Sequence, residues 1–143
     1  MEGFYVGEAV QIPHGPTTHE MFYFFDDGKV ISANFNSRTP PTAPPDWLTR
    51  ENEGKMIKDG NWGGGMGLEY WTMVSSGNYL KAGPFLFIRV TGTTDKGEWN
   101  AYIFNSRINK DGTFTTTRII VETPANILED DVRRYRPIDY KPD

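Results

Sequence analysis

Hydrophobic and polar residues alternate with a period of two along most of the chain. Between residues 4 and 12, the apolar residues Phe4, Val6 and Val10 occur at even spacing among more polar neighbours. Successive side chains of a strand point to opposite faces, so this alternation predicts a strand with one buried face. The segment 21–25 is apolar at every position, which predicts a strand that is covered on both faces.

The dipeptide Asp27-Gly28 separates segment 21–25 from a further strand pattern at 30–35. Asp-Gly between two strand patterns is a strong hairpin signal, because tight hairpin turns need positive φ angles that glycine adopts without strain. We therefore predict that the two segments pair as a hairpin.

Further strand patterns follow the middle of the chain, at 68–74, 85–91, 99–105 and 113–122. A cluster of turn-forming residues follows all but the last, and the first such cluster is Ser75-Ser76-Gly77-Asn78. Short strands separated by glycine-containing turns are typical of all-β folds. The expected fold is an antiparallel barrel or two-sheet sandwich of about seven strands, and the pattern does not choose between these two architectures.

Helical spacing is found near the C-terminus. Thr123 is a suitable N-cap, and Pro124 fits the first helical position. The apolar residues that follow recur at helical spacing, namely Ile127, Leu128 and Val132. We predict one helix over 124–135 and a tail over 137–143, all within a single domain that spans 1–143.

Residues 37–67 interrupt the alternation and form a long insert. Its first part contains four prolines between positions 40 and 45, and the segment 60–67 is mostly glycine. Proline cannot donate a hydrogen bond to a β-ladder, and a long irregular segment in a small domain is usually functional or mobile. The insert is interpreted either as a lid over a pocket or as a surface loop.

Within the insert, Gly60-Asn61-Trp62 resembles the G-x-W motif in the first strand of lipocalin-type barrels. That resemblance implies a barrel that holds a small ligand. Here, however, the motif follows two or three strand patterns, which does not fit an eight-stranded barrel that begins at the motif. We retain the hypothesis of a ligand-binding barrel without assigning the family.

Composition narrows the functional classes. The 143 residues suffice for one domain with a single core. The chain has no cysteine, which excludes disulfides and cysteine nucleophiles and favours a reducing compartment. The first residues lack the pattern of a signal peptide, and no apolar run approaches the ~20 residues of a membrane helix. We therefore expect a cytoplasmic protein without a membrane partner.

Charge and histidine content add further expectations. The net charge of −4 disfavours binding to nucleic acid, which needs clustered cations. The two histidines, His14 and His19, lie near Glu20, but their spacing in a predicted loop is not that of a metal site. We predict neither a metal nor a cofactor.

Three polar residues interrupt apolar strand faces: Glu8, Arg89 and Tyr102. A buried charge is costly unless it is paired, so an inward-facing Glu8 and Arg89 would form a polar centre in an aromatic cavity. The alternative is that the other face of strand 85–91 is the core face and that Arg89 points outwards.

Aromatic and sulfur-containing side chains would supply the apolar contacts of such a cavity. A tryptophan in a loop often stacks on a sugar, a base or a partner protein. The alternative is that the tryptophans of the insert pack onto one end of the barrel and do not contact a ligand or partner. The predicted ligand-binding residues are Trp62, Met66, Tyr70, Trp71 and Tyr23.

Three functional hypotheses remain, of which we favour the first. It is a small domain that binds a small, partly apolar or aromatic ligand in an aromatic-lined cavity. The second is a cofactor-independent isomerase, cyclase or lyase, with Glu8 as acid or base and Tyr102 or Arg89 stabilising charge. The third is a phage or immunity-type interaction module that contacts a protein partner or a second copy through residues 40–67. Fold class does not discriminate among these activities.

Overall fold

The computed structural model describes residues 2–8, 10–11, 17–37, 39–44, 61–63, 70–93, 99–122, 127–130 and 133–138. The regular structure in these ranges is entirely β-strand, which confirms the predicted all-β fold. The strands are β1 (Gly3–Gly7), β2 (Val10–Gln11), β3 (Thr17–Phe24), β4 (Lys29–Asn36), β5 (Asn61–Gly63), β6 (Tyr70–Ala82), β7 (Phe85–Thr93), β8 (Trp99–Ile108), β9 (Phe114–Glu122), β10 (Ile127–Asp130) and β11 (Arg133–Ile138).

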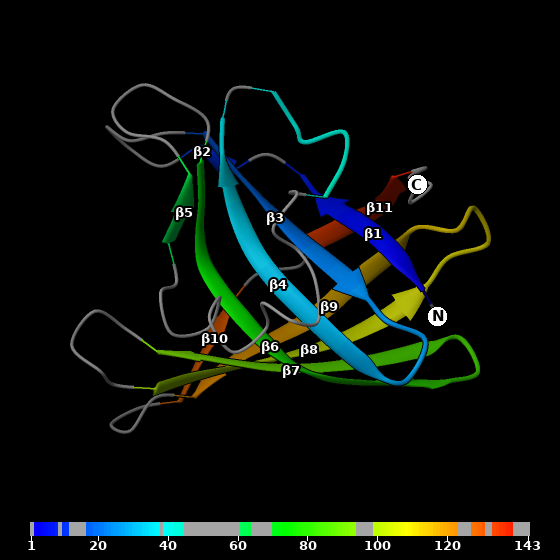
Figure 1. The fold of residues 1–143 in the computed structure, drawn as a ribbon. Coiled ribbons are helices and arrows are strands. Elements are labelled where there is room, and N and C mark those ends of the chain that lie inside the picture. Colours follow the sequence, from blue (N-terminus) through cyan, green and yellow to red (C-terminus); the bar gives the residue numbers. More distant parts are fainter. Residues whose placement is uncertain are drawn as a thin grey trace.

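Eight of these strands pair in a closed ring. In the order β1, β3, β4, β6, β7, β8, β9 and β11, each strand pairs antiparallel with the next, and β11 pairs with β1. Figure 1 shows β1 and β11 side by side where the ring closes. The short strands β2, β5 and β10 add to β3, β6 and β9. Pairing among the described residues therefore gives a barrel and not a two-sheet sandwich.

The predicted C-terminal helix over 124–135 is wrong wherever the structure describes that range. β10 and β11 are both strands, and they pair with β9 in one continuous register, from Ile127 opposite Glu122 to Tyr135 opposite Phe114. β11 also pairs with β1, which accounts for the eighth strand of the ring. A helix here would leave the backbone groups along the facing edges of β1 and β9 without partners, so tertiary pairing overrides the helical spacing.

The predicted tail over 137–143 also begins inside a strand. Pro137 and Ile138 belong to β11, opposite Tyr5 and Phe4 of β1. Residues 139–143 lie outside the described residues. Proline is tolerated in a strand where its missing N–H is not needed by the ladder, so Pro137 does not end the pairing.

The predicted hairpin around Asp27-Gly28 is confirmed. β3 and β4 pair up to Phe24 opposite Val30. Gly28 has a φ of 88°, a left-handed conformation that glycine adopts without strain. The Lys29 backbone N–H donates to Asp27 Oδ1 at 3.2 Å, which ties the turn to the start of β4.

The cluster Ser75-Ser76-Gly77-Asn78, predicted to be a turn, lies instead within β6. This strand continues to Ala82, and the chain reverses at Gly83-Pro84. Small polar residues and glycine favour turns locally, but here they occupy strand positions that face close neighbours.

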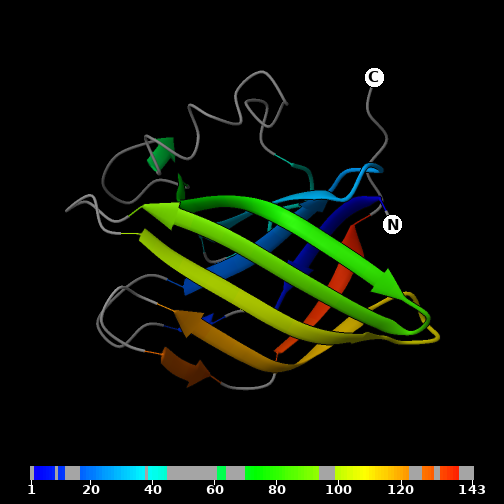
Figure 2. The same ribbon diagram turned by 90° about the horizontal axis from the view of Figure 1, so that it is seen from below.

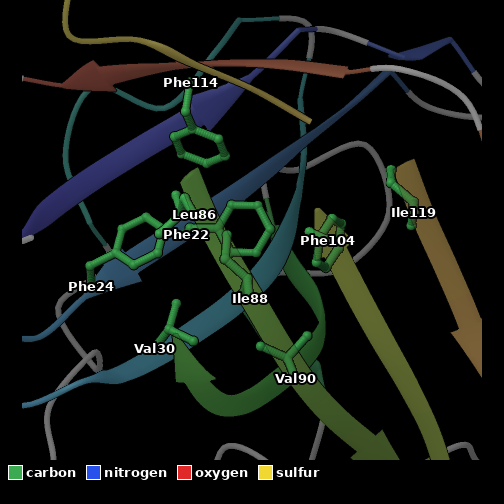
Figure 3. Packing of buried hydrophobic residues seen from close by; sticks show 9 residues of the cluster. All are labelled: Phe22, Phe24, Val30, Leu86, Ile88, Val90, Phe104, Phe114 and Ile119. Atoms are coloured by element: carbon green, nitrogen blue, oxygen red, sulfur yellow. The ribbon is translucent and has the colours of Figure 1, made fainter. Parts of the chain in front are cut away.

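An aromatic and aliphatic cluster fills the interior of the barrel near its tight turns (Figure 3). Each member is at most 2% exposed, and the members come from strands around the ring. Their side chains therefore mark the inner side of β3, β4, β7, β8 and β9. We call this set the inner cluster: Phe22, Phe24, Val30, Leu86, Ile88, Val90, Phe104, Phe114 and Ile119.

A second cluster lies on the outer side of β1, β3 and β4. Its members are buried, although the inner sides of the same strands are buried as well. Met21 and Phe22, which are consecutive, are both fully buried and confirm that segment 21–25 is covered on both faces. This outer cluster consists of Phe4, Val6, Met21, Ile31, Ala33 and Phe35.

Two tyrosines at the edge of the inner cluster make the free energy of unfolding depend on pH in the alkaline range. Burial raises the pKa of Tyr5 above its usual value of 10.0. Burial also raises the pKa of Tyr79, and the nearby carboxylates of Asp26 and Asp27 raise it further. The Tyr79 hydroxyl donates a hydrogen bond to the Phe25 carbonyl, which an ionised phenolate cannot do.

We expect the free energy of unfolding to decrease at alkaline pH. Both tyrosines have a higher pKa in the folded than in the unfolded protein, so their contribution is complete below the unfolded pKa. It is lost as the pH rises through the folded pKa values. Urea unfolding measured from neutral to strongly alkaline pH would show the decrease, and Tyr79→Phe should make it shallower. An equally steep decrease in Tyr5→Phe/Tyr79→Phe would contradict this origin.

Candidate functional site

The inner side of β3 changes from apolar to polar along its length. Phe24 and Phe22 belong to the inner cluster. Because alternate residues of a strand share a face, Glu20 and Thr18 continue the same inner side. Their partners across the β3–β4 ladder, Asn34 and Asn36, therefore lie on the inner side of β4.

Two serines extend this polar region. Ser32 is the register partner of Phe22, and Ser75 of β6 is the register partner of Ser32. The six residues thus come from three adjacent strands and occupy one end of the barrel interior. We call them the polar inner wall: Thr18, Glu20, Ser32, Asn34, Asn36 and Ser75.

The polar inner wall is shielded from solvent. Ser75, Ser32 and Asn36 are only 5%, 7% and 8% exposed, and the other members are half-buried. The Thr18 hydroxyl oxygen is buried and makes no hydrogen bond with any described residue. Leaving a buried polar group unsatisfied costs about 1–3 kcal/mol, so a bound molecule that supplied the missing partner would be favoured.

This region lies at the end of the barrel opposite the tight turns. The inner cluster adjoins the β3–β4, β6–β7 and β8–β9 turns, whereas the polar inner wall lies where β4 ends and β6 begins, at Asn36 opposite Tyr70. The long insert of the sequence joins those two residues. Binding residues are often found at the loop-bearing end of a rigid scaffold.

The wall of the barrel is irregular beside the polar residues. The β6–β7 ladder ends at Ser76 opposite Thr91, and the preceding residues 70–72 of β6 pair with β5 instead of β7. The β4–β6 register also shifts between Ser32 and Asn34. Such bulges are common beside binding sites, because they redirect side chains and interrupt pairing.

Three of the predicted ligand-binding residues come together at this end. Trp62 of β5 pairs by its backbone with Trp71 of β6, and the adjacent Tyr70 pairs with Asn36 of the polar inner wall. Residues far apart in the insert and in β6 are therefore neighbours of the polar region. Met66 lies outside the described residues.

Tyr23, the remaining predicted ligand-binding residue, lies elsewhere. It is half-buried on the outer side of β3, packed against the outer cluster. Its ring centroid is 5.1 Å from that of Phe25. The structure does not bring it to the polar inner wall.

The three predicted catalytic residues do not converge. Glu8 is exposed between β1 and β2. Arg89 is exposed on the outer side of β7, while the intervening residues of that strand form its inner side, as in the alternative interpretation of the sequence. Tyr102 faces inwards and packs against the inner cluster beside Val90. The structure thus does not join Glu8 and Arg89 in a polar centre within the barrel.

The residues of the polar inner wall were not predicted from the sequence. Ser32, Asn34 and Asn36 recur with a period of two, and this was the available signal. These polar residues alternate with the apolar residues Ile31 and Phe35, so the pattern gives this strand one polar and one apolar side. Both sides are buried in the structure, so period alone did not reveal which one faced inwards.

Metal-binding side chains are not grouped in the described part of the chain. No set of three or more His, Asp or Glu residues there is arranged to hold a metal ion. His19 and Glu20 are consecutive in β3 and therefore point to opposite faces, and His14 lies outside the described residues.

Comparison with protein-family models found no match to this chain, and comparison with curated proteins also found none. The part of the chain that the structure describes contains no helix long and apolar enough to cross a membrane. A function for the candidate site is therefore inferred from its geometry alone.

Proposed function

We propose that this protein binds a small, partly aromatic molecule at the polar end of its barrel. The observation that carries this proposal is the polar inner wall, with Ser32, Asn36 and Ser75 each less than a tenth exposed. A barrel whose interior served only as a core would more commonly continue the inner cluster, because fully buried positions are mostly occupied by apolar side chains. An eight-stranded barrel is wide enough either to be filled by side chains or to hold one small ligand.

The residues at the boundary between the inner cluster and the polar inner wall indicate the chemistry of the ligand. The half-buried, inward-facing Tyr102 presents aromatic surface, and Ser32 and Asn34 add hydroxyl and amide groups on the same inner side. Ligand sites are mostly apolar with a few placed polar groups. A compound with one ring and a hydroxyl or amide substituent would use both kinds of surface.

Access to this end is supported by the interrupted β6–β7 ladder. Beyond Ser76 and Thr91 the two strands no longer pair, and β5 takes the place of β7 beside β6. A small molecule entering there would pass Trp62 and Trp71, which pair by their backbones.

A screen of small aromatic hydroxyl and amide compounds by thermal shift would test the proposal. A compound present at a hundred times its Kd should stabilise the protein by about 2.7 kcal/mol. Asn34→Leu should then weaken the binding of that compound at least tenfold in calorimetric titration, because it removes amide hydrogen bonds from the inner wall. Asn78→Leu, an exposed position on β6, is the matched control and should leave the affinity unchanged.

Two results would contradict this function. One is the absence of any stabilising compound in the screen. The other is a ligand whose affinity is unaffected by both Asn34→Leu and Ser32→Val.

A further inference from the structure

An apolar patch lies on the outer side of β6 and β7. Among the described side chains, the large hydrophobic ones that are exposed are Leu80, Phe85 and Phe87, at 65%, 48% and 43%. They are contiguous, because Leu80 is the register partner of Phe87 and Phe85 is two residues away on the same face. Figure 2 looks towards this side of the barrel, where β6 to β9 run next to one another. Contiguous exposed apolar surface often marks an interaction site.

Two arginines border the apolar residues. Arg107 of β8 is the register partner of Phe85, and its guanidinium carbon lies 5.9 Å from the centroid of that ring. Arg89 is exposed two residues after Phe87, on the same outer side. Neither arginine forms an ion pair with a carboxylate of the described residues. We call Leu80, Phe85, Phe87, Arg89 and Arg107 the outer patch.

We propose that the outer patch binds an acidic, amphipathic segment of a partner protein. The net charge of the chain is −4, yet the outer positions of β6, β7 and β8 around the patch carry arginines and no acidic residue. A partner with carboxylates beside apolar side chains matches both features of this surface. Exposed aromatic residues and arginines are also the side chains that contribute most to protein interfaces.

The partner docks through side chains and not by adding a strand. The ring of eight strands is closed, so the outer patch lies on a sheet face and not at a free edge. β-Strand addition needs an exposed edge with unpaired backbone groups. An amphipathic helix or loop laid across the sheet fits the patch better.

Charge argues against two other occupants. A second copy bound through a two-fold axis would bring this positively charged surface against the same positively charged surface. Single-stranded nucleic acid prefers several aromatic platforms in a strongly basic groove, whereas the most exposed apolar residue here is the aliphatic Leu80. The observations therefore favour an acidic protein segment.

Fluorescence anisotropy with two labelled synthetic peptides would test the proposal. One peptide carries leucine and glutamate at helical spacing, and the other has the same leucines with lysine in place of glutamate. We expect the full chain to bind the glutamate peptide at least tenfold more tightly than the lysine peptide. Arg89→Glu/Arg107→Glu should reverse this preference, and Phe87→Ser should weaken binding of the glutamate peptide at least tenfold.

Control variants separate the patch from general effects of charge and folding. Arg89→Lys/Arg107→Lys keeps both charges and should retain the preference for glutamate. Lys110→Glu changes the charge in the exposed β8–β9 turn and should alter the affinity less than threefold. All substituted side chains are exposed, so the melting temperatures should stay close to that of the unmodified protein.

Several outcomes would overturn the proposal. These are failure of the glutamate peptide to bind, equal binding of the two peptides, or indifference of the binding to Arg89→Glu/Arg107→Glu. Tighter binding of an oligothymidylate that Phe87→Ser abolishes would assign the patch to nucleic acid. A dimer in analytical ultracentrifugation that Phe87→Ser dissociates would assign it to a second copy.

Discussion

Substitution of Gly77 by alanine is expected to destabilise the protein by more than about 4 kcal/mol, which is beyond the usual effect of a single substitution. Gly77 lies where β6 runs between β4 and β7, opposite Val30 and Val90. A Cβ atom at this position would overlap the Arg89 carbonyl oxygen. It would also lie 2.8 Å from the Arg89 carbonyl carbon and 2.9 Å from Val90 Cα.

These neighbours are backbone atoms, so no side-chain rotation relieves the overlap. β6 and β7 would have to separate, which would break the ladder on one side of the barrel. Figure 1 shows β6 curving strongly along its length. We therefore expect Gly77→Ala to fold poorly or to unfold at much lower urea concentration.

Gly83→Ala is the matched control for this prediction. Gly83 lies in the β6–β7 turn with a φ of 60°, and an added Cβ there meets nothing within 4 Å. The left-handed conformation alone costs a residue with a side chain about 1–2 kcal/mol. Equal destabilisation by the two substitutions in urea unfolding would show that the close approach of β7 to Gly77 does not cause the loss of stability in Gly77→Ala.

Replacement of Phe24 by alanine is expected to destabilise the protein by about 3–5 kcal/mol. The Phe24 side chain is fully buried in the inner cluster. Its ring centroid lies 5.0 Å from that of Tyr79, 5.4 Å from that of Tyr5 and 5.9 Å from those of Phe22 and Phe114. Removing the ring would leave a cavity at the centre of these aromatic contacts.

The comparison with Phe87→Ala separates the effect of burial from the effect of removing a phenylalanine ring. Phe87 is 43% exposed on the outer side of β7, so its truncation should cost less than about 1 kcal/mol. Phe24→Leu retains most of the volume and should cost less than about 1.5 kcal/mol. Urea unfolding of the three variants would give this order, and a Phe87→Ala effect as large as that of Phe24→Ala would refute it.

The candidate site was only partly predictable from the sequence. Trp62, Tyr70 and Trp71 were selected because aromatic residues in and beside an irregular insert often contact ligands, and the structure places their backbones together near Asn36. The residues of the polar inner wall were missed, because Ser32 and Asn34 resemble ordinary solvent-facing positions in a strand.

Local pattern determined much of the fold. Alternation with a period of two specified an all-β chain. The dipeptide Asp27-Gly28 specified a hairpin, because glycine adopts the left-handed backbone conformation of the turn without strain. The apolar run at 21–25 specified burial on both faces, because apolar side chains at every position favour removal from water on both sides of the strand. These features need only a residue and its neighbours in the chain.

The tertiary structure decided the features that depend on distant strands. Residues 124–135 have helical spacing, but β1 and β9 both offer unpaired edges, so the described parts of this segment belong to the strands β10 and β11, and β11 closes the barrel. The segment around Gly77 has turn chemistry, but the approach of β7 keeps it in a strand. The outward position of Arg89 and the inward position of Asn34 follow from which face of each strand the closed ring encloses. A period of two defines two faces, and only the closure of the ring decides which of them is inside.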